Sequence, residues 1–176
     1  MAETQIEDVS TMETANLTAH RLSERFGPEV VALVEGRDEC TVVCRKDRVA
    51  EVLTYLRDDP DLAYDRLNDL TAVDYSAYPG RETGPRFGVV YHLYSHPHHH
   101  RFRLRAQVDE ADCLITSACS VWKGAEWPER EAFDMFGIRF EGHPDLRRIL
   151  MPVNFRHYPL RKDYPVQGMG ERDVLA

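Results

Sequence analysis

Four histidines, His96, His98, His99 and His100, lie within five residues of one another. Imidazole nitrogens are good ligands for transition metals, so a cluster of this density could hold a metal ion. The cluster falls in a predicted hairpin loop, however, and the sequence offers it no fixed geometry and no carboxylate that would orient the rings. We therefore expect weak, adventitious metal binding, and a stand-alone metal-binding protein stays open as an alternative function.

Three carboxylates, those of Glu129, Glu131 and Asp134, lie in a predicted short helix and could suggest acid–base catalysis. Positions 129 and 131 point about 200° apart on a helix, so their carboxylates cannot share one substrate. Arg130 and Asp134 are four residues apart and can pair on one helix face. These charges are predicted to position a neighbouring segment or subunit through charge-assisted hydrogen bonds. The alternative is a solvated helix face with ion pairs worth ~0–1 kcal/mol.

Two other kinds of site have no support in the sequence. No nucleophile in a recognisable setting and no glycine-rich phosphate loop favours acyl or phosphoryl transfer. The cysteines, at positions 40, 44, 113 and 119, form no Cys-x-x-Cys pair. On one strand Cys40 and Cys44 would lie about 13 Å apart, too far for a disulfide or for one metal ion. Free thiols are expected, and no iron–sulfur cluster is predicted on this chain.

The elements that must position these residues follow from hydrophobic periodicity. Helices are predicted over 13–26 and 48–57, and strands over 30–35, 40–45, 70–75, 87–94 and 101–108. The last strand alternates clearly, with Phe102, Leu104, Ala106 and Val108 on one face. Short helices are predicted over 116–124 and 128–136. The fold class is α+β, a two-layer sandwich of order α-β-β-α-β-β-β followed by short helices and an extended C-terminal arm.

Four parts are predicted along the 176 residues: a flexible acidic N-terminus (1–12), an α+β domain (13–110), helices that carry the charged motif (111–138) and an extended partner-binding arm (139–176). Prolines and glycines after Gly137 prevent any long regular element in the arm. Six basic and three acidic residues lie between 137 and 165, interleaved with apolar side chains such as Leu150 and Val153. An arm of this composition must pack on its own domain or on another protein.

Two motifs in this region resemble the signatures of a known family. The first comprises Glu129-Arg130-Glu131, then Phe133-Asp134-Met135-Phe136-Gly137-Ile138, then Gly142-His143-Pro144-Asp145-Leu146-Arg147-Arg148-Ile149-Leu150. It is similar to the signature of the 30 kDa subunit of respiratory complex I, which is the C subunit in bacterial NADH:quinone oxidoreductase. The second, Pro159-Leu160-Arg161-Lys162-Asp163-Tyr164-Pro165, resembles that family's C-terminal signature. The chain departs from the family where Phe155, His157 and Tyr158 replace the usual Trp and Gly-His.

The resemblance implies a non-redox subunit in the peripheral arm of a proton-pumping NADH:quinone oxidoreductase, where it scaffolds the quinone-reducing module. Its partners would be the large quinone-site subunit (49 kDa-like, the D subunit in bacteria) and the small iron–sulfur subunits. No cofactor is expected on this chain, whereas the complex would carry FMN, iron–sulfur clusters, NADH and quinone on other subunits. The equivalent subunit of a membrane-bound hydrogenase or ferredoxin-linked complex is the alternative.

The charged residues of the two motifs are the predicted contacts to a partner. Two basic pairs are too few for recognition of anionic lipid, and arginine forks that meet carboxylates are the expected use. The predicted partner-binding residues are Glu129, Arg130, Glu131, Asp134, Asp145, Arg147, Arg148, Arg161, Lys162 and Asp163.

Charge and hydropathy limit the other classes of partner. The net charge of −8 arises in the first 120 residues, and the local basic excess in the arm is small, so nucleic acid is not an expected partner. No apolar run approaches the roughly 20 residues that span a bilayer, and the acidic first ten residues do not resemble a secretory signal. We expect a peripheral protein on the cytoplasmic face of the cell inner membrane, attached through other subunits.

Overall fold

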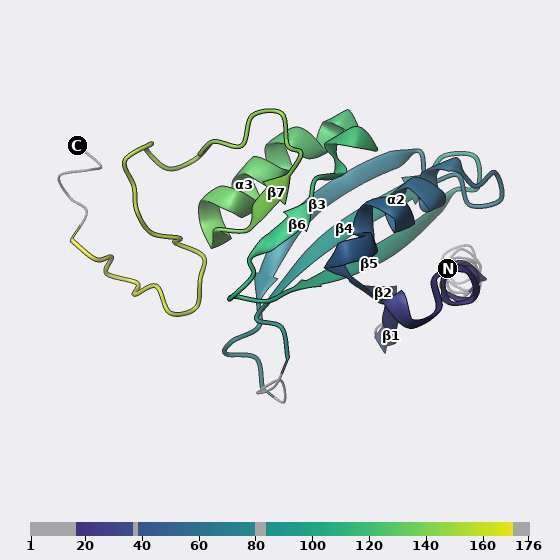
Figure 1. The fold of residues 1–176 in the computed structure, drawn as a ribbon, viewed down its shortest axis with the longest axis horizontal. Helices are drawn as coiled ribbons and strands as arrows, with labels where there is room; N and C mark the ends of the chain where they lie inside the picture. The colour runs from purple at the N-terminus through teal and green to yellow at the C-terminus, as the bar shows by residue number, and fades with distance from the viewer. Residues whose placement is uncertain (1–16, 37–38, 80–83, 171–176) are drawn as a thin grey trace, which may run out of the picture.

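A mixed five-stranded sheet forms the centre of the fold, in the order β1-β2-β5-β4-β3 (Figure 1). The computed structural model describes residues 17–36, 39–79 and 84–170. The strands are β1 (Val30–Gly36), β2 (Glu39–Arg45), β3 (Arg66–Asp74), β4 (Phe87–Ser95) and β5 (His100–Val108). Only β2 and β5 pair in parallel, and the other neighbours are antiparallel. The predicted α+β class is confirmed.

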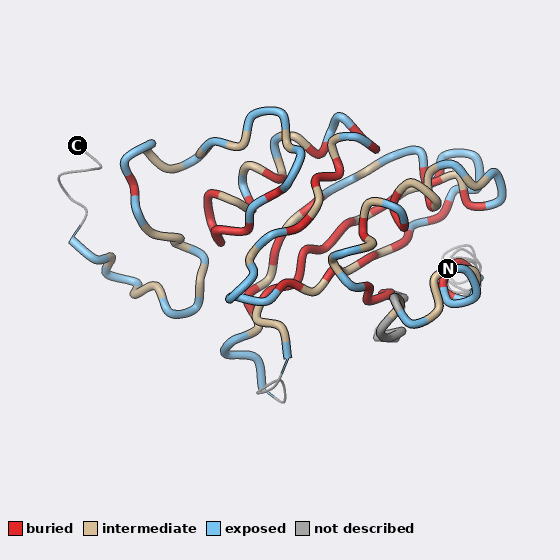
Figure 2. Tube along the Cα trace, viewed as in Figure 1, coloured by how far each residue is buried: buried red, intermediate tan, exposed pale blue. Residues whose placement is uncertain are grey.

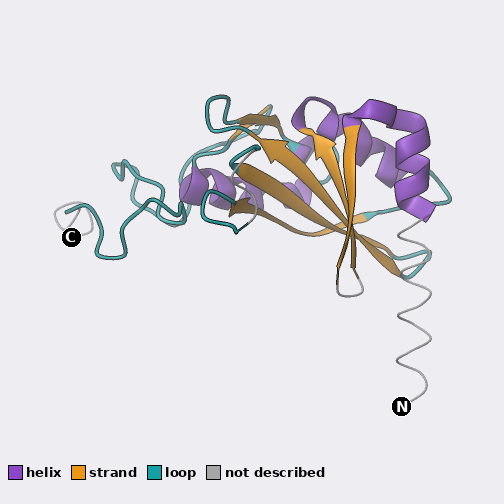
Figure 3. Cartoon of the chain, turned by 90° about the horizontal axis from the view of Figure 1, so that it is seen from below, coloured by secondary structure: helices purple, strands orange, loops and turns teal. Residues whose placement is uncertain are grey.

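Periodic burial explains why the main elements form as the sequence indicates. In β5 the residues Phe102, Leu104, Ala106 and Val108 are buried, and those between them are partly exposed. Helix α2 (Val49–Asp58) buries Val49, Val52, Leu53 and Leu56 along one face. Residues 17–26 are also helical, and the predicted start of that helix at 13 lies outside the described residues. Figure 3 shows these two helices together on one side of the twisted sheet.

A second, smaller unit lies beside the edge strand β3. It consists of the parallel pair β6 (Leu114–Thr116) and β7 (Arg139–Glu141), with α3 (Glu126–Phe136) between them in the chain. Helix α3 packs along β3, next to the sheet (Figure 1). Two 3₁₀ turns, η3 (Ala118–Ser120) and η4 (Lys123–Ala125), take the place of the single short helix predicted over 116–124.

The start of the predicted arm differs from the structure. Residues 139–141 form β7, and the side chain of Phe140 is buried, so the regular fold continues past the predicted boundary at 139. From 142 to 170 the chain has turns and bends but no helix or strand. We call residues 142–170 the C-terminal segment. None of the helices within the described residues has the length and apolar character needed to cross a membrane.

Gly137 ends α3 in a conformation that only glycine adopts easily. Its φ is +80°, and a Cβ atom there would lie 2.6 Å from Cζ of Tyr158 and 2.9 Å from Nη2 of Arg161. A left-handed non-glycine residue costs roughly 1–2 kcal/mol before any clash is counted. We predict that Gly137→Ala lowers the free energy of unfolding by about 2 kcal/mol or more, measured by urea denaturation. Gly124→Ala, where nothing lies within 4 Å of the added Cβ, is the matched control, and equal losses in both variants would contradict the prediction.

Candidate partner-binding surface around the C-terminal segment

The carboxylate of Asp134 holds the start of the C-terminal segment against α3. The side chain of Asp134 is fully buried, and its Oδ2 accepts the backbone N–H groups of Ile149, Leu150 and Met151 at 3.0, 2.7 and 2.8 Å. Its Oδ1 accepts a hydrogen bond from Nη1 of Arg148 at 2.5 Å. We call this set of contacts the first clamp. Burial alone would raise the pKa of Asp134, but these donors outweigh it and lower that pKa.

Two arginines complete the first clamp by binding backbone oxygens. Arg130 donates to the carbonyl oxygens of Arg147 and Arg148, both at 3.0 Å. Arg148 also donates to the carbonyl oxygen of His157 at 3.2 Å. The expected pairing of Arg130 with Asp134 on one helix face is therefore not what the structure has, because each side chain reaches across to the C-terminal segment. Backbone N–H and C=O groups in an irregular segment have no partners in a helix or sheet, so side chains such as Arg130 and Asp134 pair with them instead.

Asp74 and Arg86 hold the end of the C-terminal segment against the sheet. The Asp74 carboxylate is fully buried and accepts Nη2 of Arg86 at 2.8 Å and the backbone N–H of Lys162 at 2.9 Å. Arg86 also donates to Asp163 at 2.8 Å and to Glu110 at 2.7 Å. We call this the second clamp. Burial favours the neutral acid, but the Arg86 guanidinium and the N–H groups of Lys162 and Ser76 outweigh it and hold the pKa of Asp74 well below its usual range.

Arg161 adds stacking to the second clamp. Its Nε donates to the carbonyl oxygen of Phe136 at 2.7 Å. Its guanidinium lies 5.0 Å from the ring centroid of Phe87 and 4.7 Å from that of Tyr158, in cation–π geometry. Arg161 thus connects the C-terminal motif both to the end of α3 and to the first residue of β4.

Glu129 is used inside the chain. It is fully buried, and its carboxylate accepts the Ser117 hydroxyl and the Ala118 N–H, both at 2.6 Å. The prediction that Glu129 and Asp134 contact a partner is corrected here, because neither side chain reaches the surface. The signal passed over for Glu129 is its spacing: Glu129, Ala132 and Phe136 lie three to four residues apart and share one buried face of α3.

A pH-dependent stability is expected from Glu129. Burial raises the pKa of this carboxyl, against the opposing effect of Ser117 and Ala118. A raised folded-state pKa gives stability that is complete below the unfolded-state value and is lost as the pH rises through the folded-state value. We predict that Glu129→Gln, which cannot ionise, becomes progressively more stable relative to the parent as the pH is raised above about 4.5. Urea denaturation between pH 4.5 and 8 measures the difference in the free energy of unfolding between Glu129→Gln and the parent. A difference that does not change with pH would contradict the prediction. Glu131→Gln, at an exposed carboxylate, is the control.

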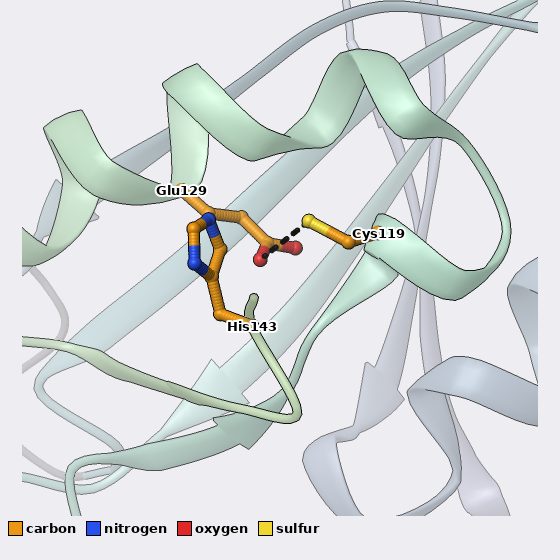
Figure 4. A group of neighbouring side chains, drawn as sticks. All are labelled: Cys119, Glu129 and His143. Carbon is orange, nitrogen blue, oxygen red and sulfur yellow. Dashed lines mark hydrogen bonds between the residues drawn. The ribbon is translucent and has the colours of Figure 1, made fainter. Parts of the chain in front are cut away.

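Cys119 and His143 lie next to Glu129 and form a three-residue group (Figure 4). One potential ligand atom from each lies within 4.8 Å of the others, which is a spacing that a metal ion could use. Their polar groups already form hydrogen bonds, however. Nδ1 of His143 accepts the Asp145 N–H at 3.0 Å, so Nε2 carries the proton and donates to the Glu126 carbonyl oxygen at 2.9 Å. Cys119 donates to Glu129 at 3.6 Å, and burial raises the pKa of its thiol to about 11. As arranged, the group is a hydrogen-bonded connection between η3, α3 and the start of the C-terminal segment.

The four histidines of the β4–β5 turn face different partners. Nδ1 of His96 lies 2.9 Å from Asp65, and Nε2 of His98 donates to the Pro60 carbonyl oxygen at 3.0 Å. Nδ1 of His99 lies 3.5 Å from the Tyr94 hydroxyl, and His100 is buried beside Tyr64. Asp65 is a carboxylate beside the cluster that the sequence did not reveal, because it lies 31 residues away. Within the described residues the four imidazoles do not converge on one point. Weak metal binding by this loop stays a prediction.

Comparison with known families identifies the group to which the chain is related. The family described as the 30 kDa subunit of respiratory-chain NADH dehydrogenase matches residues 42–169. The chain belongs to this family. The matched range contains both clamps, so the resemblance stated from the two motifs is confirmed and extends over most of the sheet.

Several members of the family are similar over most of their length. The C subunit of NADH-quinone oxidoreductase from Citrifermentans bemidjiense is 50% identical over 157 residues, which are 89% of this chain and 93% of that protein. The corresponding protein of Geotalea uraniireducens is 43% identical over 160 residues, covering 91% and 93%. That of Burkholderia multivorans is 46% identical over 152 residues, covering 85% of this chain and 76% of that protein.

Two solved structures share the fold. A trypsin-resistant fragment (1–134) of Nqo5 superposes with a TM-score of 0.63 and 32% sequence identity, covering 72% of this chain and 97% of the fragment. A chain of the archaeal membrane-bound sulfane sulfur reductase superposes with a TM-score of 0.66 over 87% of this chain and 86% of that one. Its sequence is 19% identical, so this second similarity is one of fold alone.

In this member of the family the clamps leave a distinct set of side chains on the surface. Five predicted partner contacts are exposed: Glu131, Asp145, Arg147, Lys162 and Asp163. Large apolar side chains are exposed in the same stretch of chain, namely Trp127, Leu150, Val153, Leu160, Val166 and Met169. Figure 2 shows the contrast between the buried central strands and the largely exposed C-terminal segment. Exposed apolar groups in this number are typical of a surface that another protein covers.

Proposed function

We propose that this chain is a non-redox subunit of an NADH:quinone oxidoreductase and that its C-terminal segment docks on neighbouring subunits of the peripheral arm. The observation that carries the proposal is the C-terminal segment itself, which is fixed at two buried carboxylates and yet leaves cationic and apolar side chains exposed between them. A segment held in one shape loses little conformational freedom when a partner binds. The chain thereby fixes the geometry of the quinone-reducing module and performs no redox step itself.

The partners proposed are the large quinone-site subunit (49 kDa-like, the D subunit in bacteria) and the small iron–sulfur subunits. FMN, iron–sulfur clusters, NADH and quinone would be bound by other subunits of the complex. The cysteines support this division of roles. Among the described residues, the group of potential metal ligands that converges contains a single cysteine, and burial raises the pKa of the Cys44 thiol to about 12. Attachment to the cytoplasmic face of the membrane would be indirect, through those subunits.

The equivalent subunit of a membrane-bound hydrogenase or ferredoxin-linked complex is the alternative, since this fold also occurs in a respiratory membrane complex of another kind, the sulfane sulfur reductase. The identities of 43% and 50% with the C subunits of two NADH-quinone oxidoreductases favour the first assignment. Purification of the tagged chain from membranes at low ionic strength distinguishes the two. Co-purifying NADH-oxidising subunits and NADH:quinone activity are the expected result, and hydrogenase or ferredoxin-binding subunits would overturn the assignment of the electron donor.

A charge-reversal variant tests the docking role of the C-terminal segment. The residues to change are Arg147 and Lys162, whose side chains are exposed, and not Arg148, whose side chain is only 11% exposed and is held by Asp134. We predict that Arg147→Glu with Lys162→Glu lowers incorporation into the complex about tenfold, because opposite charges across an interface become like charges. Surface substitutions leave folding within about 0.5 kcal/mol, so the isolated variant should unfold as the parent does.

The control is Arg101→Glu, an exposed position on β5 of the sheet and outside the C-terminal segment. Quantitative mass spectrometry of purified complexes gives the incorporation of each variant. Normal incorporation of the double variant, at normal quinone reductase activity, would refute docking through these charges.

A further inference from the structure

A shallow groove of about 450 Å³ lies where α3 meets the edge strand β3, and Ile149 and Leu150 of the C-terminal segment also line it. We infer that this groove receives a segment of a neighbouring subunit in which a large apolar side chain lies next to a lysine or arginine. The inference rests on the proposed function and adds to it the chemistry of one contact. It concerns Trp127 and Glu131 of α3, Asp69 and Leu70 of β3, and Leu150.

The apolar part of the groove is exposed to an unusual degree. Trp127 is 68% exposed and Leu150 is 61% exposed, whereas Leu70, which also lines the groove, is 3% exposed. The other large apolar residues of α3 do not face solvent in this way, since Met135 and Phe136 are buried. Tryptophan is among the residues that contribute most to binding energy at protein interfaces. The two side chains therefore form a slot that an apolar side chain of a partner would fill.

The rim of the groove is acidic. The carboxylates of Asp69 and Glu131 are exposed and line the same groove as Trp127. Asp69 accepts the Leu70 N–H at 2.9 Å, and within the described residues neither carboxylate forms an ion pair. Two uncompensated negative charges beside an apolar slot favour a partner side chain that brings a positive charge. An arginine or lysine flanking the inserted apolar side chain meets this requirement.

The same charges argue against two other occupants. An isologous contact between two copies of the chain would bring Asp69 and Glu131 of one copy against those of the other, which is repulsive. Anionic lipid head groups would be repelled in the same way. A segment of a different subunit is the occupant that remains, and it lies in line with the proposed docking surface, because Leu150 belongs both to the groove and to the C-terminal segment. The first clamp holds the Leu150 N–H at 2.7 Å, so this wall is already formed before binding.

Site-specific photo-cross-linking in the intact complex tests the inference. A benzophenone amino acid replaces Glu131, or Glu24 on the helix over 17–26 as an exposed control, and membranes are irradiated before mass spectrometry. The expected product joins position 131 to one peptide of another subunit that contains an apolar residue adjacent to Lys or Arg, and position 24 does not yield that peptide. A cross-link to a second copy of the chain, to lipid alone, to a peptide without a basic residue, or to nothing would overturn the inference.

Substitutions give an independent measure. We expect Trp127→Ala with Leu150→Ala to lower retention of the chain in the complex at least tenfold during a salt wash, whereas Tyr78→Ala, 59% exposed outside the groove, leaves retention unchanged. Glu131→Lys should lower it more than Glu131→Gln. If the chain co-purifies with the complex and all variants are retained equally, the inference about the groove is overturned. Absence of the parent chain from the complex would instead overturn the proposed function.

Discussion

Replacement of Asp134 by alanine should lower the free energy of unfolding by about 3–5 kcal/mol and release the C-terminal segment from α3. The change leaves the Arg148 guanidinium, 11% exposed, without its carboxylate. A buried charge that loses its partner costs this much in measured cases. The N–H groups of Ile149, Leu150 and Met151 lose their acceptor at the same time, which adds to the loss.

Urea denaturation and limited trypsin digestion measure the two effects. Arg147, Arg148 and Arg156 lie in the C-terminal segment, so cleavage there should become faster in Asp134→Ala. Glu131→Ala, an exposed carboxylate one turn away on the same helix, is the matched control and should behave as the parent does. Equal stability and equal cleavage rates in the two variants would show that Asp134 does not hold the segment.

Acidification should produce the same release without mutation. The pKa values of Asp134 and Asp74 are lowered in the folded state. A carboxyl with a lowered pKa contributes stability that is present above its unfolded-state value, near 3.8, and is lost as the pH falls through the folded-state value. The two clamps therefore stabilise the chain at neutral pH and weaken in acid, whereas Glu129 acts in the opposite direction.

The second large effect is expected for Arg86→Met, which should destabilise the chain by about 3–5 kcal/mol. The Arg86 side chain is 13% exposed and is the cation beside the fully buried Asp74. Its removal leaves that carboxylate buried and without a counter-charge. Arg86→Lys should recover part of the loss, because lysine keeps the charge but cannot form the two-pronged contact to Asp74 and Asp163.

A double-mutant cycle separates this ion pair from a general packing effect. If Asp74 is the group left unpaired, Asp74→Asn combined with Arg86→Met should cost clearly less than the sum of the two single changes. Thermal or urea unfolding of the four proteins gives the interaction energy, and strictly additive losses would exclude the pair as the cause. Asp163→Asn serves as a control, because Asp163 is 64% exposed and its contact with Arg86 is screened by solvent.

The sequence predicted those parts of the fold that depend on local periodicity. Apolar residues alternate in β5 and recur every three to four residues in α2, and each pattern indicates which face is buried. Both elements form where expected. The parallel pair of β6 and β7 could not be predicted in the same way. Each strand has only three residues, too few to show an alternating pattern of buried and exposed positions. The paired residues Ile115 and Phe140 are also separated in the sequence by all of α3.

The site was predicted less completely, because sequence spacing does not say whether a charge faces inward. The charged residues of the two motifs were predicted to contact a partner, whereas Asp134 and Glu129 are buried and bind groups of their own chain. Asp74 was missed although a signal existed: Leu70, Ala72 and Asp74 alternate along β3 and share its buried face. A carboxylate at such a position requires a buried cation, and Arg86, 12 residues further on, supplies it.

The two clamps differ in the length of the chain between the residues that they join, and this difference affects the order in which they form. Contacts of Asp134 reach 14 to 17 residues along the chain, whereas Asp74 meets Lys162 across 88 residues. Contacts distant in sequence form more slowly because a longer loop must be ordered first. The Asp134 contacts of the first clamp need only α3 and residues up to Met151, whereas the second clamp must wait for the sheet and for Lys162. As the chain folds, the C-terminal segment would thus be secured at α3 first and at the sheet last.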